Sequence, residues 1–268
     1  DRRQRQMCIR DSFQNNMLEH LNRWLNQGVF TAGDADTAAA VTAVSAKYTP
    51  LYVVTGDAYS QWSGQNSTTQ YRTVTRTRQT AQGRSENYTE QEPYKEWHPA
   101  AGQHTGHYRV AISAAPALPQ TDLDKLAGDV GNFRADEGAQ PYAGVPPSDN
   151  IAVVEPAFDD AEAKRQAVIK MEGLERAACS SLVEKLDACS TQVTNVALRL
   201  AYHPFWWITY AYKGKHYNCV MDGRTGACAG KKPVSKKKVV LAIILGIAVI
   251  TLVILALVCL GGGYCVST

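Results

Sequence analysis

Residues 239–260 form an uninterrupted apolar run, and this run constrains what the rest of the chain can be. It contains no charged residue, no proline and no amide side chain. As a helix it would extend about 33 Å at about 1.5 Å per residue, enough to cross a bilayer core of about 30 Å. The alternative, a buried helix of a soluble protein, would need a large domain around it, and only eight residues follow. We therefore expect a C-terminal transmembrane helix that tethers everything before it.

Five lysines directly precede the apolar run: Lys231, Lys232, Lys236, Lys237 and Lys238. No acidic residue occurs from position 231 onward, so this region carries a charge of +5. Lysines beside a span tend to stay in the cytoplasm, and each contributes about 1 kcal/mol of attraction to anionic lipid headgroups. We expect a protein of the inner (plasma) membrane whose body faces the cytoplasm, with the lipid bilayer as one partner and its cysteines reduced.

Residues 1–12 are interpreted apart from the fold. Residues 2–12 are similar, residue for residue, to one reading frame of a transposase adapter used in shotgun DNA sequencing. We interpret the segment as a sequencing-adapter artefact and expect the natural start to be missing. The alternative is a basic arm that binds nucleic acid. A genomic copy that continues through these residues would favour that alternative.

The remaining body is mildly acidic. Residues 13–230 hold 19 basic and 23 acidic residues, a net charge of about −4. A phosphate-binding face is therefore not indicated, and we expect no nucleic-acid partner.

Hydrophobic patterning predicts an α+β fold with small antiparallel sheets and a long amphipathic helix before the transmembrane helix. The first part should hold an amphipathic helix at 13–27, strands at 48–54, 71–78 and 108–113, and a polar loop at 79–91. The long helix should begin after Asp159 as N-cap and end near Ala188, with its apolar face at Ile169, Leu174, Ala178, Leu182 and Leu186. A β meander at 193–201, 205–212 and 216–221 should follow, with a tight turn at Asp222-Gly223.

These elements divide the chain into consecutive segments: an α+β subdomain at 13–155, a helix and β meander at 156–232, the basic collar at 233–238, the span at 239–260 and a short tail at 261–268. A weak internal repeat, which we call the internal echo, links the first two segments. Tyr48-x-Pro50-Leu51-Tyr52 and Tyr202-x-Pro204-Phe205-Trp206 both open a strand, which suggests two related β units. Because Gly261-Gly262-Gly263 can form a loop, a fragment of a multi-span protein is a further alternative.

Several short sequence motifs are spread over residues 13–238. They are Trp24 before the Tyr48-Pro50-Tyr52 strand, Glu96-Trp97-His98-Pro99-Ala100-Ala101-Gly102, Val110-Ala111-Ile112-Ser113-Ala114, Leu118-Pro119, the run Pro204, Trp207, Tyr210, Tyr212-Lys213-Gly214-Lys215, then Asp222-Gly223-Arg224-Thr225-Gly226 and Pro233-Val234-Ser235. Together they resemble a bacterial family of uncharacterised membrane proteins with an N-terminal zinc ribbon, often labelled primosomal-helicase-like. The final hairpin also resembles a PepSY-type unit. The resemblance implies architecture and membrane location but no established activity.

The zinc ribbon of that family is absent from this sequence. No C-x-x-C pair occurs among the seven cysteines, so any zinc of that kind would belong to the missing start. A Gly226–Lys232 segment superficially similar to a phosphate loop lacks the spacing and the Ser/Thr of one, which argues against ATPase or helicase activity.

Two further groups of residues are candidates for a site. His98, His104 and His107 lie around Gly102 and Gly106 and would bind Zn²⁺ or Cu²⁺ if they converged, although ordinary loop histidines are the simpler interpretation. Trp206, Tyr210 and Tyr212 lie on an aromatic-rich strand and would form a partner-binding edge for an extended peptide; the alternative, which we favour, is a sheet core.

From the sequence we expect a membrane-anchored binding or scaffold module that recruits another protein, with no catalytic, cofactor or metal residues in this chain. The alternative is a membrane-bound metal-dependent enzyme or metal sensor that uses a His98/His104/His107 loop.

Overall fold

The computed structural model describes residues 17–79, 83–134 and 151–261. The artefact expected at 1–12 and the first residues of the helix expected at 13–27 lie outside the described residues.

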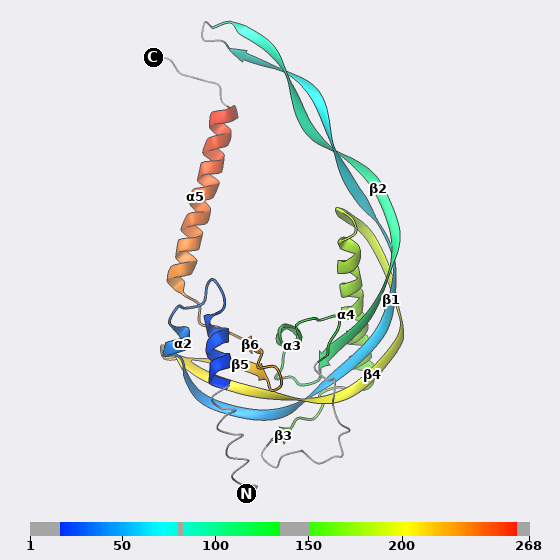
Figure 1. Cartoon of the computed structure of the whole chain (residues 1–268), viewed down its shortest axis with the longest axis vertical. Coiled ribbons are helices and arrows are strands. Elements are labelled where there is room, and N and C mark those ends of the chain that lie inside the picture. Colours follow the sequence, from blue (N-terminus) through cyan, green and yellow to red (C-terminus); the bar gives the residue numbers. More distant parts are fainter. Residues whose placement is uncertain (1–16, 80–82, 135–150, 262–268) are drawn as a thin grey trace.

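One curved antiparallel sheet organises the protein (Figure 1). Its strand order is β2-β1-β4-β5-β6, and β3 pairs with β1 in parallel. A helix at 17–26 comes first, and the elements that follow are α2 (Ala35–Ala38), β1 (Ala40–Gln79), β2 (Ser85–Ser113), α3 (Gln120–Ala127), β3 (Ala152–Val153), α4 (Asp160–Ser180), β4 (Lys185–Tyr212), β5 (Lys215–Asp222), β6 (Cys228–Gly230) and α5 (Lys236–Gly261). The α+β class agrees with the sequence, but the expectation of several small sheets was wrong.

The centre of the sheet is a pseudo-two-fold axis between β1 and β4. Tyr48 pairs with Pro204 and Pro50 pairs with Tyr202, so the two echoing motifs are each other's cross-strand partners. The motifs lie 154 residues apart, and the same offset aligns the end of helix 17–26 with Ser180 at the end of α4. The chain therefore consists of two similar helix–strand–strand halves that share one sheet rather than forming separate sheets.

The outer strands follow the same symmetry. Gly56 of β1 pairs with Tyr108, and Tyr210, which aligns with Gly56, pairs with Tyr217. His107-Tyr108 in β2 is thereby equivalent to His216-Tyr217 in β5.

Each half contributes its helix to the strands of the other half. Helix 17–26 buries Met17, Leu21 and Leu25 against Ile208, Tyr210, Cys219 and Met221 of β4 and β5. Helix α4 buries Ala163, Ala167 and Met171 against Tyr52, Val54, Val110 and Ile112 of β1 and β2. Because side chains alternate along a strand, both helices lie on one face, and α3 covers the other face by packing Leu123 and Leu126 against Leu51, Val53 and Phe205. This exchange ties the halves into a single folding unit.

Helix α4 differs from its predicted form in length and in its buried face. Asp159 is the N-cap, and its carboxylate accepts a hydrogen bond from the backbone N–H of Glu162 at 3.0 Å, as expected. The helix ends at Ser180 because the chain turns there to enter β4. The buried stripe is Ala163, Ala167, Met171, Glu175 and Cys179, whereas Ile169 of the predicted apolar face is 56% exposed.

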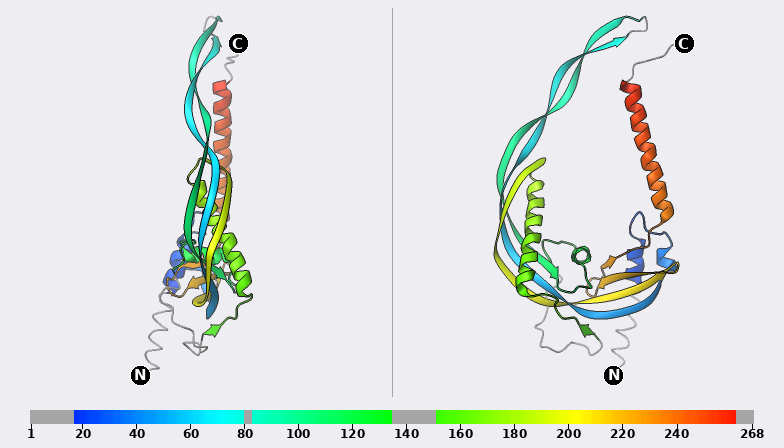
Figure 2. Two further views of the ribbon diagram at one scale, coloured as in Figure 1. Left: turned by 90° about the vertical axis from the view of Figure 1, so that its right-hand side faces the viewer. Right: turned by 180° about the vertical axis from the view of Figure 1, so that it is seen from behind.

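Helix α5 is long and apolar enough to cross a membrane, and its described side chains are exposed apart from the half-buried Val239 and Ala242 near its start. It begins beside helix 17–26, where Ser235 N–H donates to Phe30 O at 2.9 Å and Ala32 N–H donates to Pro233 O at 3.0 Å. The outer part of the β1–β2 hairpin and α5 extend from the body toward the same side (Figures 1 and 2).

A buried hydrogen bond between His203 and Asp222 holds the hairpin between β4 and β6 in place. Asp222 accepts from His203 Nε2 at 2.9 Å and from the backbone N–H of Arg224 at 2.7 Å and Thr225 at 3.2 Å. Burial alone would raise the pKa of Asp222, but these hydrogen bonds and the His203 charge lower it below its ordinary value.

We expect Asp222→Ala to lower the free energy of unfolding by about 3–5 kcal/mol, because it leaves the buried His203 and the N–H groups of Arg224 and Thr225 without their acceptor. Since the folded pKa of Asp222 is depressed, its contribution is present above the unfolded pKa of about 4 and is lost as the pH falls through the folded pKa. Denaturant unfolding of the full chain at neutral and acid pH measures both effects.

Glu19→Ala is the matched control. Glu19 forms an exposed pair with Arg23 at 2.7 Å, and its loss should change stability by less than about 0.5 kcal/mol. An equal loss of unfolding free energy in the two variants would contradict a stabilising role for the buried contact between His203 and Asp222.

Candidate functional site

The long β1–β2 hairpin is an addition to one half of the symmetric fold. Ala58 pairs with Gly106, and these positions are equivalent to Tyr212 and Lys215, which flank the two-residue turn Lys213-Gly214. In the second half the chain therefore turns at once. In the first half it continues as two strands, residues 59–79 and 85–105, which we call the arm.

The outer arm has no core. Beyond Gln65, the partner of Lys185, the arm is two-stranded, and no residue of 66–79 or 85–98 is buried. One face carries cross-strand ion pairs, Arg72–Glu92 at 2.9 Å, Arg76–Glu90 at 3.3 Å and Arg78–Glu86 at 3.2 Å. The opposite face is mostly neutral and contains the paired residues Thr73 with Gln91, Thr75 with Thr89 and Thr77 with Asn87. The polar loop predicted at 79–91 was wrong for residues 85–91, which belong to β2.

A buried polar cluster lies at the base of the arm, between β2 and α4. Glu175 has a fully buried side chain, and its Oε2 accepts a hydrogen bond from the Tyr108 hydroxyl at 2.6 Å. Its Oε1 lies 2.7 Å from His104 Nδ1. Cys179, one helical turn along α4, is also buried, and burial raises the pKa of its thiol to about 11. Burial and the Glu175 carboxylate also raise the pKa of Tyr108.

The symmetry of the fold shows that this cluster is not required for packing. The 154-residue offset aligns Met17 with Met171, Leu21 with Glu175 and Leu25 with Cys179. Leu21 and Leu25 are ordinary core residues in the first helix. A carboxylate and a thiol thus occupy positions that the other half fills with leucine.

The three histidines of the sequence analysis lie on one continuous strand, not on a loop, and they do not converge. His104 and His107 point to opposite faces of β2 because they are an odd number of residues apart. His107 Nδ1 lies 2.6 Å from Asp57 Oδ1, and His98 Nε2 lies 2.9 Å from Thr68 Oγ1 farther up the arm. His104 is the one member that meets Glu175 and Cys179.

Sequence reasoning missed Glu175 and Cys179, which lie about seventy residues from His104. The signal that could have found them was the internal echo, because extending its offset to the helices places them opposite two leucines.

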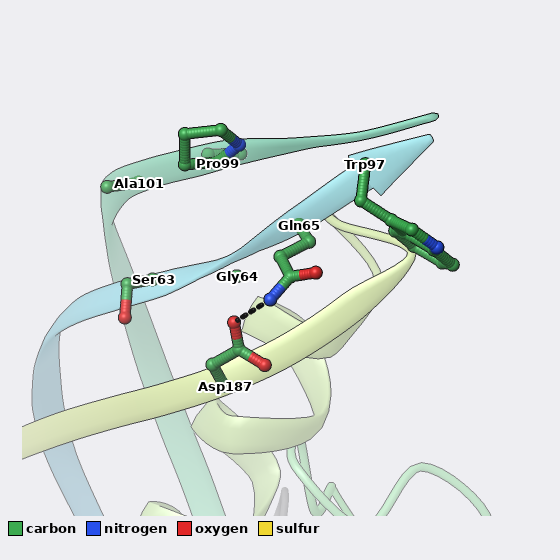
Figure 3. A pocket seen from close by; sticks show the side chains of 8 residues that line it. Ser63, Gly64, Gln65, Trp97, Pro99, Ala101 and Asp187 are labelled. Atoms are coloured by element: carbon green, nitrogen blue, oxygen red, sulfur yellow. Dashed lines mark hydrogen bonds between the residues drawn. The ribbon is translucent and has the colours of Figure 1, made fainter. Parts of the chain in front are cut away.

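An open groove of about 540 Å³ lies where β4 begins beside the arm (Figure 3). Trp97 and Pro99 of β2 line it together with Gly64 and Gln65 of β1, and Gln65 Nε2 donates to Asp187 Oδ2 at 3.0 Å. Lys95 lies over the exposed Trp97 ring at 5.2 Å. No sequence pattern pointed to this groove.

The aromatic strand is core, as the favoured interpretation had it. Tyr210 is fully buried and its hydroxyl donates to Lys231 O at 2.7 Å, while the buried Tyr212 donates to Asp34 Oδ1 at 2.6 Å. Trp206 packs against the same cluster and is half-buried. Tyr210 and Tyr212 therefore contribute to the core of this structure, and a partner-binding role for Trp206, Tyr210 and Tyr212 stays a prediction.

Two of the five lysines between positions 231 and 238 bind the body. Lys232 Nζ contacts the carbonyls of Trp24 and Gln27, the latter at 2.7 Å, and Lys238 Nζ donates to Thr31 O at 2.9 Å. These lysines satisfy carbonyls at and just beyond the C-terminal end of helix 17–26. Lys231, Lys236 and Lys237 are exposed.

Comparisons with known proteins find no matching family model, no similar curated protein and no similar solved structure.

We expect Gly106→Ala to destabilise the protein by about 1–3 kcal/mol, because a Cβ there would lie 2.6 Å from Glu175 Oε2 and from the Tyr108 ring. Gly173→Ala, on the helix that carries Glu175, is the control: nothing lies within 4 Å of its Cβ position, and alanine should stabilise the helix by about 0.5–1 kcal/mol. Thermal unfolding of the full chain in detergent compares the two. We expect the melting temperature to fall in Gly106→Ala and to rise in Gly173→Ala. Equal shifts in the two variants would contradict close packing at Gly106.

Proposed function

We propose that this protein is a membrane-anchored binding module whose arm engages another protein in the cytoplasm. The observation that carries the proposal is the arm itself, which replaces a two-residue turn in one half of an otherwise repeated fold.

An isolated two-stranded ribbon is marginally stable in water, and exposed ion pairs such as Arg78–Glu86 add less than about 1 kcal/mol each. A feature of this length that contributes no core to its own fold is best explained by contacts with something else. Its mixed charge and its exposed Tyr71, Tyr94 and Trp97 suit a protein surface better than nucleic acid, because positive charge does not dominate.

Membrane attachment is assigned to α5 and to Lys231, Lys236 and Lys237 at its start. The flanking lysines favour a cytoplasmic body. The arm cannot share the hydrocarbon with α5, since each arginine or glutamate there would cost several kcal/mol. Under this proposal α5 therefore changes its direction relative to the arm when it enters a bilayer, and the arm stays in water.

The alternative of a metal-dependent enzyme based on His98, His104 and His107 loses its geometric basis, because the three imidazoles do not converge. The zinc ribbon and the PepSY relationship remain predictions from the sequence resemblance.

We expect the full chain to sediment with membranes in detergent-free lysate, and a variant ending after Ser235 to stay in the supernatant while keeping its far-UV circular dichroism. High-speed centrifugation followed by immunoblotting measures this. Labelling of a cysteine introduced at the exposed Val29, in a variant whose Cys259 and Cys265 are replaced by serine, tests orientation: an impermeant maleimide should reach it only after the cells are opened. Full-length protein in the supernatant would refute the tether, and labelling of intact cells would refute the orientation.

We expect the photoreactive residue p-benzoylphenylalanine at Tyr71, on the arm, to form a discrete cross-linked adduct in cells. The same residue at Val29, on the body, is the control; the two natural side chains are 65% and 80% exposed. Immunoblotting and mass spectrometry identify the adduct.

A shortened variant sharpens this test. Replacing residues 67–97 by Asn-Gly would join the paired residues Asn66 and His98 through a tight turn. It should remain in the membrane and bind the partner at least tenfold more weakly. The absence of an adduct at Tyr71, or an equal adduct at Val29, would contradict the proposal that the arm binds a partner. An adduct of twice the chain mass would show that this partner is a second copy of the chain and not another protein.

A further inference from the structure

We propose that His104, Glu175 and Cys179 form a Zn²⁺ site at the base of the arm. This inference is independent of the partner that the arm binds, and it concerns a different set of residues from the three histidines considered in the sequence.

The donor atoms are already gathered. One nitrogen of His104, one carboxylate oxygen of Glu175 and the sulfur of Cys179 all lie within 4.8 Å of one another. Zinc ligands stand about 2.0–2.3 Å from the ion, so a tetrahedral site needs its donors roughly 3.5 Å apart. Side-chain adjustments of about 1 Å are therefore enough to admit the ion. The 2.7 Å contact between His104 and Glu175 would open, and the ion would replace it.

The donor set selects the kind of ion. A thiolate, an imidazole and a carboxylate together match the borderline-soft character of Zn²⁺, whereas Mg²⁺ and Ca²⁺ prefer oxygen alone. Three protein ligands leave the fourth position for water, the arrangement found in zinc sites that keep an open position. The His104 side chain is 30% exposed, so an ion can reach the cluster from solvent.

The surroundings hold the ligands in place without closing the site. Tyr108 donates to Glu175 Oε2, which leaves Oε1 directed toward His104. Gly106 lets β2 approach α4 closely at this point, since any side chain would overlap Glu175 and Tyr108. A hydrogen bond such as the one from Tyr108 to Glu175 orients a metal ligand toward the ion.

The other half of the chain shows what the two helix positions need for packing alone. Leu21 and Leu25 show that this helix position packs well with apolar side chains in the other half. Burying a carboxylate instead is costly unless it is paired, and a hydrogen-bonded acid is seldom more stable than a well-packed hydrophobic residue. The substitution of Glu175 and Cys179 for leucines is thus explained by binding rather than by stability.

The test uses the metal-stripped full chain in detergent or nanodiscs, titrated with Co²⁺ as a spectroscopic probe and then with Zn²⁺. We expect one equivalent of Co²⁺ with a thiolate-to-metal charge-transfer band, and displacement of this band by Zn²⁺. Cys179→Ser should abolish the band and His104→Ala should weaken binding at least 100-fold. Tyr108→Phe should weaken it about 10–100-fold.

Controls separate metal binding from folding. Cys219→Ala removes a buried cysteine of the other half, and His107→Ala removes the neighbouring imidazole on the opposite face; both should keep the band. Glu175→Leu copies Leu21, should fold, and should lose the rise in melting temperature that Zn²⁺ gives the natural chain. The proposal is overturned if the chain takes up no metal at micromolar concentration, if the band survives Cys179→Ser, or if Zn²⁺ stabilises Glu175→Leu as much as the natural protein.

Discussion

The pairing of β1 with β4 around Thr49 and His203 is the interaction on which the rest of the structure depends. It joins the two halves, and it places the helix of each half over the strands of the other. A slip of one residue in this register would place Tyr52 and Ile208 on opposite faces of the sheet, so the two helices could no longer cover both from one side. The helices can therefore pack only when the central pair is correctly aligned.

Comparing the two halves of the fold shows which features packing requires and which features are present in one half only. The second half ends its hairpin in a tight turn, and the helix over it presents Leu21 and Leu25. The first half extends its hairpin into the arm, and its covering helix presents Glu175 and Cys179. Both departures occur on the β1–β2 side of the sheet and meet at His104, which indicates one specialised region on an otherwise repeated scaffold.

The sequence predicted the elements that carry a strong local signal. The apolar run of α5, the N-cap Asp159 and the two Tyr-x-Pro motifs were all identified from residue types alone. The arm could not be predicted as one element because neither of its outer faces is buried, and a strand without a buried face has no hydrophobic alternation to detect. The buried stripe of α4 was missed because, apart from Met171, it consists of small or polar residues, while the larger Ile169 faces solvent.

The cluster at the base of the arm also lies where the arm is attached to the body. Farther along, the arm is tied to the start of β4 by exposed polar contacts, among them Ser67 Oγ to Glu184 at 2.7 Å and Lys95 to Glu184 at 3.0 Å. Such contacts exchange readily with water and hold a direction weakly. The buried contact of His104 with Glu175 joins β2 to α4 below them, in surroundings where an ion or a hydrogen bond is stronger. Any change at Glu175 therefore acts on the attachment of the arm itself, and the chemistry of the cluster is coupled to where the arm points.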